Sequence, residues 1–75
     1  MKYELINSID SYVATDTTAG IDITDKDGNF ICELNGMGLS YFENENGDID
    51  EDRLESVIRN QIAVEEFLDN QGAIY

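Results

Sequence analysis

Two glycine-containing dipeptides in the middle of the chain constrain its fold more than any other feature. Asp27-Gly28 and Asn35-Gly36 are both preferred in two-residue β-hairpin turns, and apolar residues alternate with polar ones around them. Together the two turns predict a three-stranded antiparallel meander, because both registers place the same apolar side chains on one face of the sheet. Those side chains are Ile21, Ile23, Phe30, Cys32, Leu34, Met37, Leu39 and Tyr41.

The predicted registers can be checked pair by pair. The first turn places Asp25 opposite Phe30, Ile23 opposite Cys32 and Ile21 opposite Leu34; the second places Leu34 opposite Met37, Cys32 opposite Leu39 and Phe30 opposite Tyr41. On the other face of the sheet, Asp22 then lies beside Glu33.

Amphipathic segments at both ends of the chain predict one helix before the meander in the sequence and one after it. Five apolar residues of the segment 1–14 fall within about 120° of a helical wheel, although residues 11–18 could instead extend as a strand. The helical period returns from Asp50 to Asn70, with Gly72 placed as a stop and Asp48 or Asp50 as a cap. We therefore expect one α+β domain over residues 1–75, in the order α-βββ-α, with the C-terminal helix covering the apolar side of the sheet.

Two polar residues inside the apolar stripe of the predicted C-terminal helix leave its continuity open. Gln61 and Glu65 lie among the apolar positions. Either the helix kinks or divides near Asn60, or these two side chains lie at the rim of the core.

Length and cysteine content exclude several classes of protein. The chain has 75 residues and is 41% apolar, which suits a small folded domain better than a disordered acidic tail. One cysteine and no histidine exclude an internal disulfide and the usual Cys/His zinc sites, and they favour a reducing compartment. No signal-peptide pattern and no apolar stretch of about 20 residues is present. We expect a cytoplasmic protein, in the host cytoplasm if the chain is phage-encoded.

The charge balance points to a basic partner. Seventeen acidic and four basic side chains give a net charge of -13. Direct binding to nucleic acid or to an anionic membrane depends on Lys and Arg, so this balance argues against both. We expect the partner to be a basic protein, such as a nucleic-acid enzyme.

Seven of the acids lie in one short span that contains a single cation, Arg53. Their charge either belongs to ordinary solvated surface or is meant for that basic partner. Helix capping and the helix dipole account for acids in the first helical turn, but not for the acids that precede it. The span contains Glu43, Glu45, Asp48, Asp50, Glu51, Asp52 and Glu55.

The predicted pairing of Asp22 with Glu33 adds to this indication. Like charges directly opposed on two strands destabilise a sheet. We therefore add Asp22 and Glu33 to the candidate partner-binding residues.

No motif in the chain indicates catalysis, a cofactor or a specific metal site. Neither DKDGN nor ENENGDI fits an EF-hand loop, because positions 1 and 12 around each glycine are not carboxylates. Cys32 has no histidine to activate it and is predicted to face the core, as a small buried apolar residue. We expect no catalytic residue and no cofactor.

As a pattern, the chain resembles the small acidic inhibitors that phages and mobile elements use against nucleic-acid enzymes. These include Cas9-blocking anti-CRISPR proteins, anti-restriction proteins and inhibitors of uracil-DNA glycosylase. One Cas9-blocking anti-CRISPR is similar in layout, with a DGN turn like Asp27-Gly28-Asn29 and an acidic Glu/Asn stretch like residues 43–46. This chain lacks that family's second C-terminal helix, unless one begins near Asn60.

The resemblance implies a mechanism. In that family, acidic side chains occupy the protein pocket that otherwise holds DNA, which here implicates Glu43, Glu45 and Asp48, and more loosely residues 50–55. We therefore expect a non-enzymatic DNA mimic that blocks the basic groove of a defence nuclease such as Cas9 or a restriction enzyme. The alternative is an immunity or antitoxin protein that neutralises a basic nuclease toxin. Tyr41, Phe42 and Tyr75 are candidate apolar anchors for such a partner.

Overall fold

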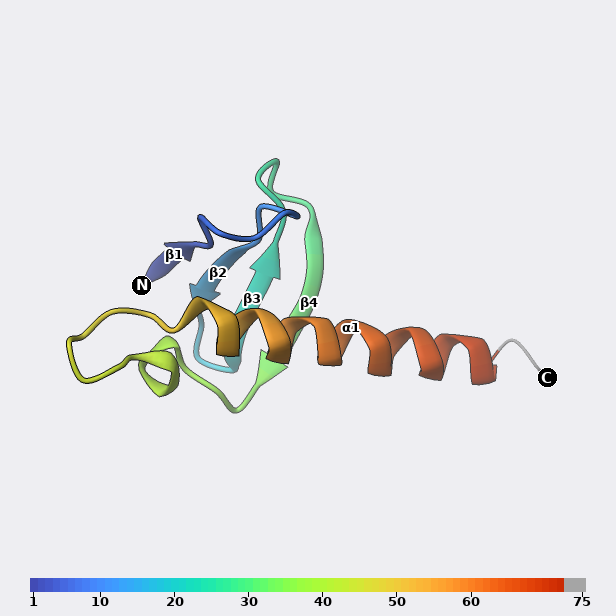
Figure 1. Ribbon diagram of the computed structural model, residues 1–75. Coiled ribbons are helices and arrows are strands. Elements are labelled where there is room, and N and C mark those ends of the chain that lie inside the picture. The colour runs from blue at the N-terminus through green and yellow to red at the C-terminus, as the bar shows by residue number, and fades with distance from the viewer. Residues whose placement is uncertain (73–75) are drawn as a thin grey trace.

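The computed structural model describes residues 1–72 and consists of a four-stranded antiparallel sheet, a short 3-10 helix and one long α-helix (Figure 1). The strands follow one another in the sheet in chain order. The predicted α-βββ-α order is therefore wrong, because residues 1–72 contain no N-terminal helix and form a sheet of four strands rather than three. The elements are β1 (Lys2–Glu4), β2 (Val13–Asp16), β3 (Gly20–Thr24), β4 (Phe30–Asn35), η1 (Leu39–Phe42) and α1 (Glu51–Gly72).

The N-terminal segment forms two paired strands joined by a loop. Tyr3 lies opposite Ala14, and Leu5 N donates a hydrogen bond to Tyr12 O at 3.0 Å as the loop begins. Leu5 and Tyr12 are buried, whereas Ile6 and Ile9 are 81% and 93% exposed. These apolar residues therefore do not form one face of a helix, although their spacing would allow it. The alternative of a strand within residues 11–18 is confirmed by β2.

The turn predicted at Asp27-Gly28 is present, but its loop has three residues rather than two. Gly28 N donates to Asp25 O, and Asp25 N donates to Asn29 O. Gly28 has a φ of 87°, as expected for a three-residue hairpin that ends in a left-handed residue. Asp25 therefore pairs with Asn29 and not with Phe30.

An irregularity between Ile23 and Thr24 restores the predicted register beyond this loop. Thr24 pairs with Phe30, whereas Ile23 pairs with Cys32, so Ile31 is the extra residue of a bulge on β4. The predicted pairs Ile23–Cys32, Ile21–Leu34 and Asp22–Glu33 are confirmed.

The second predicted hairpin is wrong, because the chain does not return along β4 after Asn35-Gly36. Gly36 has the left-handed φ of 75° that a turn requires, but its N–H donates to Ala19 O on the side of β3. Leu39 N then donates to Asp16 Oδ1 at 2.9 Å, and residues 39–42 form η1 instead of a strand. The carboxylate of Asp16 thus holds the first residue of η1, which takes the place of the predicted third strand.

Helix α1 covers one face of the sheet with its first half. Leu54 and Ile58 are fully buried against the apolar side chains of β3 and β4, and Val57 and Ile62 are partly buried. Leu39 and Phe42 of η1 complete this core, whereas Phe30, Met37 and Tyr41 are exposed, contrary to the predicted apolar face. The helix is continuous past Asn60, so it neither divides there nor provides a second C-terminal helix.

Among residues 1–72, no helix combines the length and apolar character needed to cross a membrane.

Candidate functional site

Residues 43–52, which we name the acidic loop, form a compact excursion between η1 and α1. Glu43 bridges to Ile49, Asn44 N donates to Asp48 O at 2.7 Å, and Asp50 N donates to Phe42 O at 2.6 Å. In Figure 1 this segment is the yellow loop that projects from the start of α1. Its ends are therefore held together by backbone hydrogen bonds.

Asn44 organises the tip of the acidic loop. Its Oδ1 accepts hydrogen bonds from Asn46 N at 2.9 Å and from Asp48 N at 3.1 Å, as in an Asx turn. Gly47 follows with a left-handed φ of 83°. Sequence reasoning overlooked this role of Asn44, although an Asn three residues before a Gly is a usable turn signal.

Of the two predicted caps, Asp48 and Asp50, Asp50 is the one that caps α1. Its Oδ1 accepts from Arg53 N at 3.2 Å, and its backbone carbonyl accepts from Leu54 N at 3.1 Å. The carboxylates of Glu51 and Asp52 occupy the first turn, where the helix dipole favours negative charge. Capping therefore accounts for Asp50, and the dipole for part of the charge beside it.

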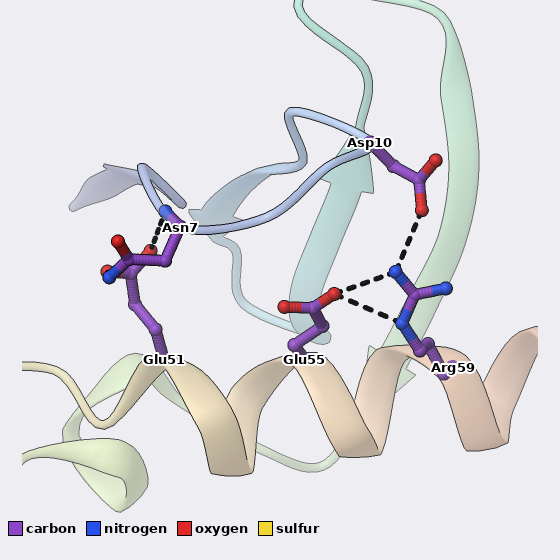
Figure 2. A network of polar contacts seen from close by, with 5 residues as sticks. All are labelled: Asn7, Asp10, Glu51, Glu55 and Arg59. Atoms are coloured by element: carbon purple, nitrogen blue, oxygen red, sulfur yellow. Dashed lines mark hydrogen bonds and ion pairs between the residues drawn. The ribbon is translucent and has the colours of Figure 1, made fainter.

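Glu51 connects α1 to the loop between β1 and β2 directly, and Glu55 does so through Arg59. Figure 2 shows Glu51 beneath Asn7, whose Nδ2 donates to Glu51 Oε2 at 2.9 Å and whose N donates to Glu51 Oε1 at 3.3 Å. About two turns further along α1, Arg59 pairs with Glu55 at 2.7 Å and with Asp10 at 2.9 Å. Glu51 and Glu55 thus have partners within the chain.

The remaining acids of the run have no such partners. Glu43, Glu45, Asp48 and Asp52 are all exposed. Within residues 1–72, no hydrogen bond or ion pair uses their carboxylates, so these four charges are available to a second molecule.

Asp22 and Glu33 lie apart from the acidic loop. They alternate with the buried residues of β3 and β4, which places them on the sheet face that α1 does not cover. A hydrogen bond with the Asp22 carboxyl, partial burial and repulsion between the two charges raise the pKa of Glu33. Asp22 Oδ1 is itself buried without a partner. The structure therefore separates this pair from the other predicted site residues.

The charge of the acidic loop affects the pKa of Tyr3 on β1. Burial raises the pKa of the Tyr3 hydroxyl, and the charge of Glu51, a hydrogen bond to that carboxylate and the charge of Asp48 raise it further. A shallow hollow of about 260 Å³ opens beside these groups and is lined by Asn7, Asn44, Ile49, Asp50, Glu51 and Asp52. Its lining is mainly polar and acidic, which suits a cationic side chain.

A larger hollow, of about 330 Å³, lies against the β1–β2 loop and away from the predicted site. Its lining includes Glu4, Ser8, Tyr12 and Lys26. Ser8 Oγ is buried there without a hydrogen-bond partner. No predicted site residue lines this hollow.

The candidate anchors fall in different environments. Tyr41 is 63% exposed and lies two residues before the acidic loop, whereas Phe42 is buried in the core beneath Arg53, whose guanidinium is 5.6 Å from the ring centre. Tyr75 lies outside the described residues. The exposed Ile6 and Ile9, which the helical interpretation had assigned to an apolar face, lie in the β1–β2 loop on either side of Asn7, which bonds to Glu51.

The single cysteine lies in the core, as predicted. Cys32 is fully buried in β4, and burial, followed by the charge of Glu65, raises the pKa of its thiol to about 11. A thiol of this kind stays protonated near neutral pH. Within the described part of the chain, no three Cys, Asp or Glu side chains are grouped as a metal site requires.

Comparison of the chain with protein-family models, with curated proteins and with solved structures found no match.

Proposed function

We propose that the chain is a non-enzymatic inhibitor that mimics nucleic acid and acts in the cytoplasm. Its acidic loop would occupy the basic DNA-binding groove of a nuclease such as Cas9 or a restriction enzyme. The observation that carries the proposal is the group of four exposed carboxylates, Glu43, Glu45, Asp48 and Asp52, which have no partner within residues 1–72. Inhibition then follows from steric and electrostatic competition with DNA.

The construction of the acidic loop supports this proposal. Free carboxylates on a flexible segment would have to be ordered on binding, which costs free energy. Here backbone hydrogen bonds close the loop, and Asn44 fixes its tip. The charges are therefore presented on an ordered backbone, as phosphates are on a duplex.

The two arginines near the acidic loop are engaged elsewhere and leave its four carboxylates without a counter-charge, which also supports the proposal. Of the two arginines near the loop, Arg59 pairs with Asp10 and Glu55, and Arg53 lies over the Phe42 ring. At a net charge of -13, attraction to a basic groove would speed association and weaken steeply with added salt.

Affinity capture at low salt tests the proposal. The wild-type chain is immobilised beside a variant carrying Glu43→Gln, Glu45→Gln and Asp48→Asn, and captured proteins are then challenged with duplex DNA. A matched control carries Glu4→Gln, Glu66→Gln and Asp69→Asn, which removes three exposed acids elsewhere. Both variants have a net charge of -10, because three charges are removed from -13.

The expected result is a DNA-binding enzyme captured by the wild type and the control, lost with the acidic-loop variant and released by DNA. Equal loss with both variants would show that net charge alone attracts the partner, and would overturn the role of the loop. Capture of a nuclease that DNA does not release would instead support the neutralisation of a toxin.

A further inference from the structure

The tip of the acidic loop contains an Asn-Gly dipeptide with an unengaged side chain. Asn46 and Gly47 are both exposed, and among the described residues no hydrogen bond involves the side chain of Asn46. The space around Gly47 is open, since an added Cβ would meet no atom within 4 Å. Glycine has no side chain to hinder its own nitrogen, so Gly47 N can approach the Asn46 amide more easily than the nitrogen of any other residue type could.

From this arrangement we infer that Asn46 is a site of spontaneous deamidation. Gly47 N gives its proton to a base from the solvent and forms a bond to Asn46 Cγ, and the bond from Cγ to Nδ2 breaks with release of ammonia. Water then opens the cyclic succinimide at one of its two carbonyls. One product is aspartate, and the other is isoaspartate, in which the main chain runs through the former side chain. Water is the only co-reactant, and either product changes the net charge from -13 to -14.

A single backbone hydrogen bond restrains the attacking nitrogen. Gly47 N donates to Asn44 O at 3.0 Å, so this turn must open before the new bond can form. Exposed hydrogen bonds of surface loops open locally at a much lower free energy than the whole domain does. The reaction should therefore proceed in the folded chain, although more slowly than in an unstructured peptide.

The second Asn-Gly dipeptide of the chain is held more firmly. Asn35 is the last residue of β4 and pairs with Gly20, and Gly36 N donates to Ala19 O at 3.0 Å. The two strands are so close that a Cβ added to Gly20 would lie 3.0 Å from Asn35 Cα. Succinimide formation here requires the end of the β3–β4 ladder to separate. Asn46 should therefore react first.

The loop between β3 and β4 indicates what the aspartate product should do. Asp25 Oδ1 accepts from Asp27 N at 2.8 Å and from Asn29 N at 2.9 Å, and Gly28 N donates to Asp25 O. The acidic loop has the same hydrogen bonds, and Asp27 occupies the place that Asn46 has there. An aspartate at this place is thus compatible with the turn, so the aspartate product should keep it.

The isoaspartate product should instead loosen the tip. Asn44 Oδ1 accepts from the amides of residues 46 and 48, at 2.9 and 3.1 Å. An additional main-chain carbon in residue 46 changes the spacing of these two amides, so the pair of bonds should be lost. The exposed carboxylates would then no longer stand on an ordered backbone. This last effect limits the lifetime of an inhibitor and rests on the proposed function, whereas the reaction itself does not.

Incubation of the full chain at mildly alkaline pH, followed by peptide mapping, tests the inference. Electron-transfer fragmentation in the mass spectrometer separates aspartate from isoaspartate at each position, and circular dichroism verifies that the chain stays folded. Asn46 should convert at least about tenfold faster than Asn35, a difference of about 1.4 kcal/mol in the barrier. In urea the two rates should converge, because the fold then restrains neither site.

Two variants assign the reaction to its residue. Asn46→Gln should remove the main product with added charge from the ion-exchange profile, and Asn35→Gln, the matched control, should leave it unchanged. Equal rates at the two sites of the folded chain, an intact Asn46, or aspartate without isoaspartate would each overturn the inference. Capture of a basic partner is measured separately on freshly purified chain, so the proposed function and the deamidation can fail independently.

Discussion

The carboxylates near the start of α1 fall into two groups with different surroundings. The carboxylates of Asp50, Glu51 and Glu55 each accept a hydrogen bond from within the chain. Within residues 1–72, the carboxylates of the other four, Glu43, Glu45, Asp48 and Asp52, accept none. The groups overlap in sequence and have the same chemistry. The difference shows that a run of acids can combine structural charges with available ones, and that only the fold separates the two.

Removal of the helix cap is expected to have the largest effect among the structural acids. Asp50→Ala should lower the free energy of unfolding by about 1 kcal/mol, because Arg53 N loses its acceptor. Asp50→Asn should restore most of this loss, and Asp48→Ala should change stability by less than about 0.5 kcal/mol. Urea unfolding of the three variants measures the contrast. Equal losses at Asp48 and Asp50 would break the distinction between the groups.

Loss of the contact between Glu51 and Asn7 should have a smaller effect. Glu51→Ala removes both hydrogen bonds and should cost about 0.5 to 1 kcal/mol, which urea unfolding would measure. It should also lower the pKa of Tyr3 toward its ordinary value, because the charge and hydrogen bond of Glu51 help to raise it. A titration of the tyrosine ring carbons by NMR follows this pKa. A Tyr3 pKa unaffected by the change would mean that Glu51 is as free as Glu45.

Removal of the Asp22 charge on the uncovered sheet face should increase stability rather than lower it, and should have the smallest effect of the three changes. Asp22 raises the pKa of Glu33 in the folded state, so the folded chain favours the protonated form of Glu33. The stabilisation from protonated Glu33 is therefore present at low pH and is lost as pH rises through that pKa. Asp22→Asn should therefore raise the midpoint of thermal unfolding at pH 7 and have less effect near pH 3. Thermal melts at the two pH values make the comparison. A lower midpoint at pH 7 would show that the charge of Asp22 is needed for folding.

Local chemistry made the centre of the fold predictable. Asp27-Gly28 specified a turn, and the alternation around it gave the pairs Ile21–Leu34 and Ile23–Cys32. The pairs survive although the loop has one residue more than predicted, because the bulge at Ile31 offsets the difference. The apolar period of α1 was equally informative over the half that packs on the sheet.

The two ends of the meander were not predictable from local pattern, because distant residues decide them. Leu5 and Tyr12 have helical spacing, but pairing of β1 with β2 buries both while Ile6 and Ile9 remain exposed. After Gly36, the carboxylate of Asp16 directs the chain into η1. Such contacts override intrinsic propensity, and no window of neighbouring residues contains them.

The candidate site was predictable as a composition but not as an arrangement. The acidic run identified the right segment of chain, yet the partners of Glu51 and Glu55 come from Asn7, Asp10 and Arg59. Asp22 and Glu33 entered the same list by charge, and strand alternation then placed them on the sheet face that α1 leaves uncovered.

The tie between α1 and the β1–β2 loop has a consequence for synthesis of the chain. Asn7 and Asp10 lie 44 and 49 residues before their partners on α1, so the ribosome must have made Glu51 and Arg59 before these contacts can form. Contacts between residues so far apart in sequence also slow folding in general. A nascent chain that ends before α1 contains all four strands but lacks Leu54 and Ile58, which cover the sheet. The sheet should therefore complete its folding only after translation of α1, so a segment made later stabilises the strands made before it.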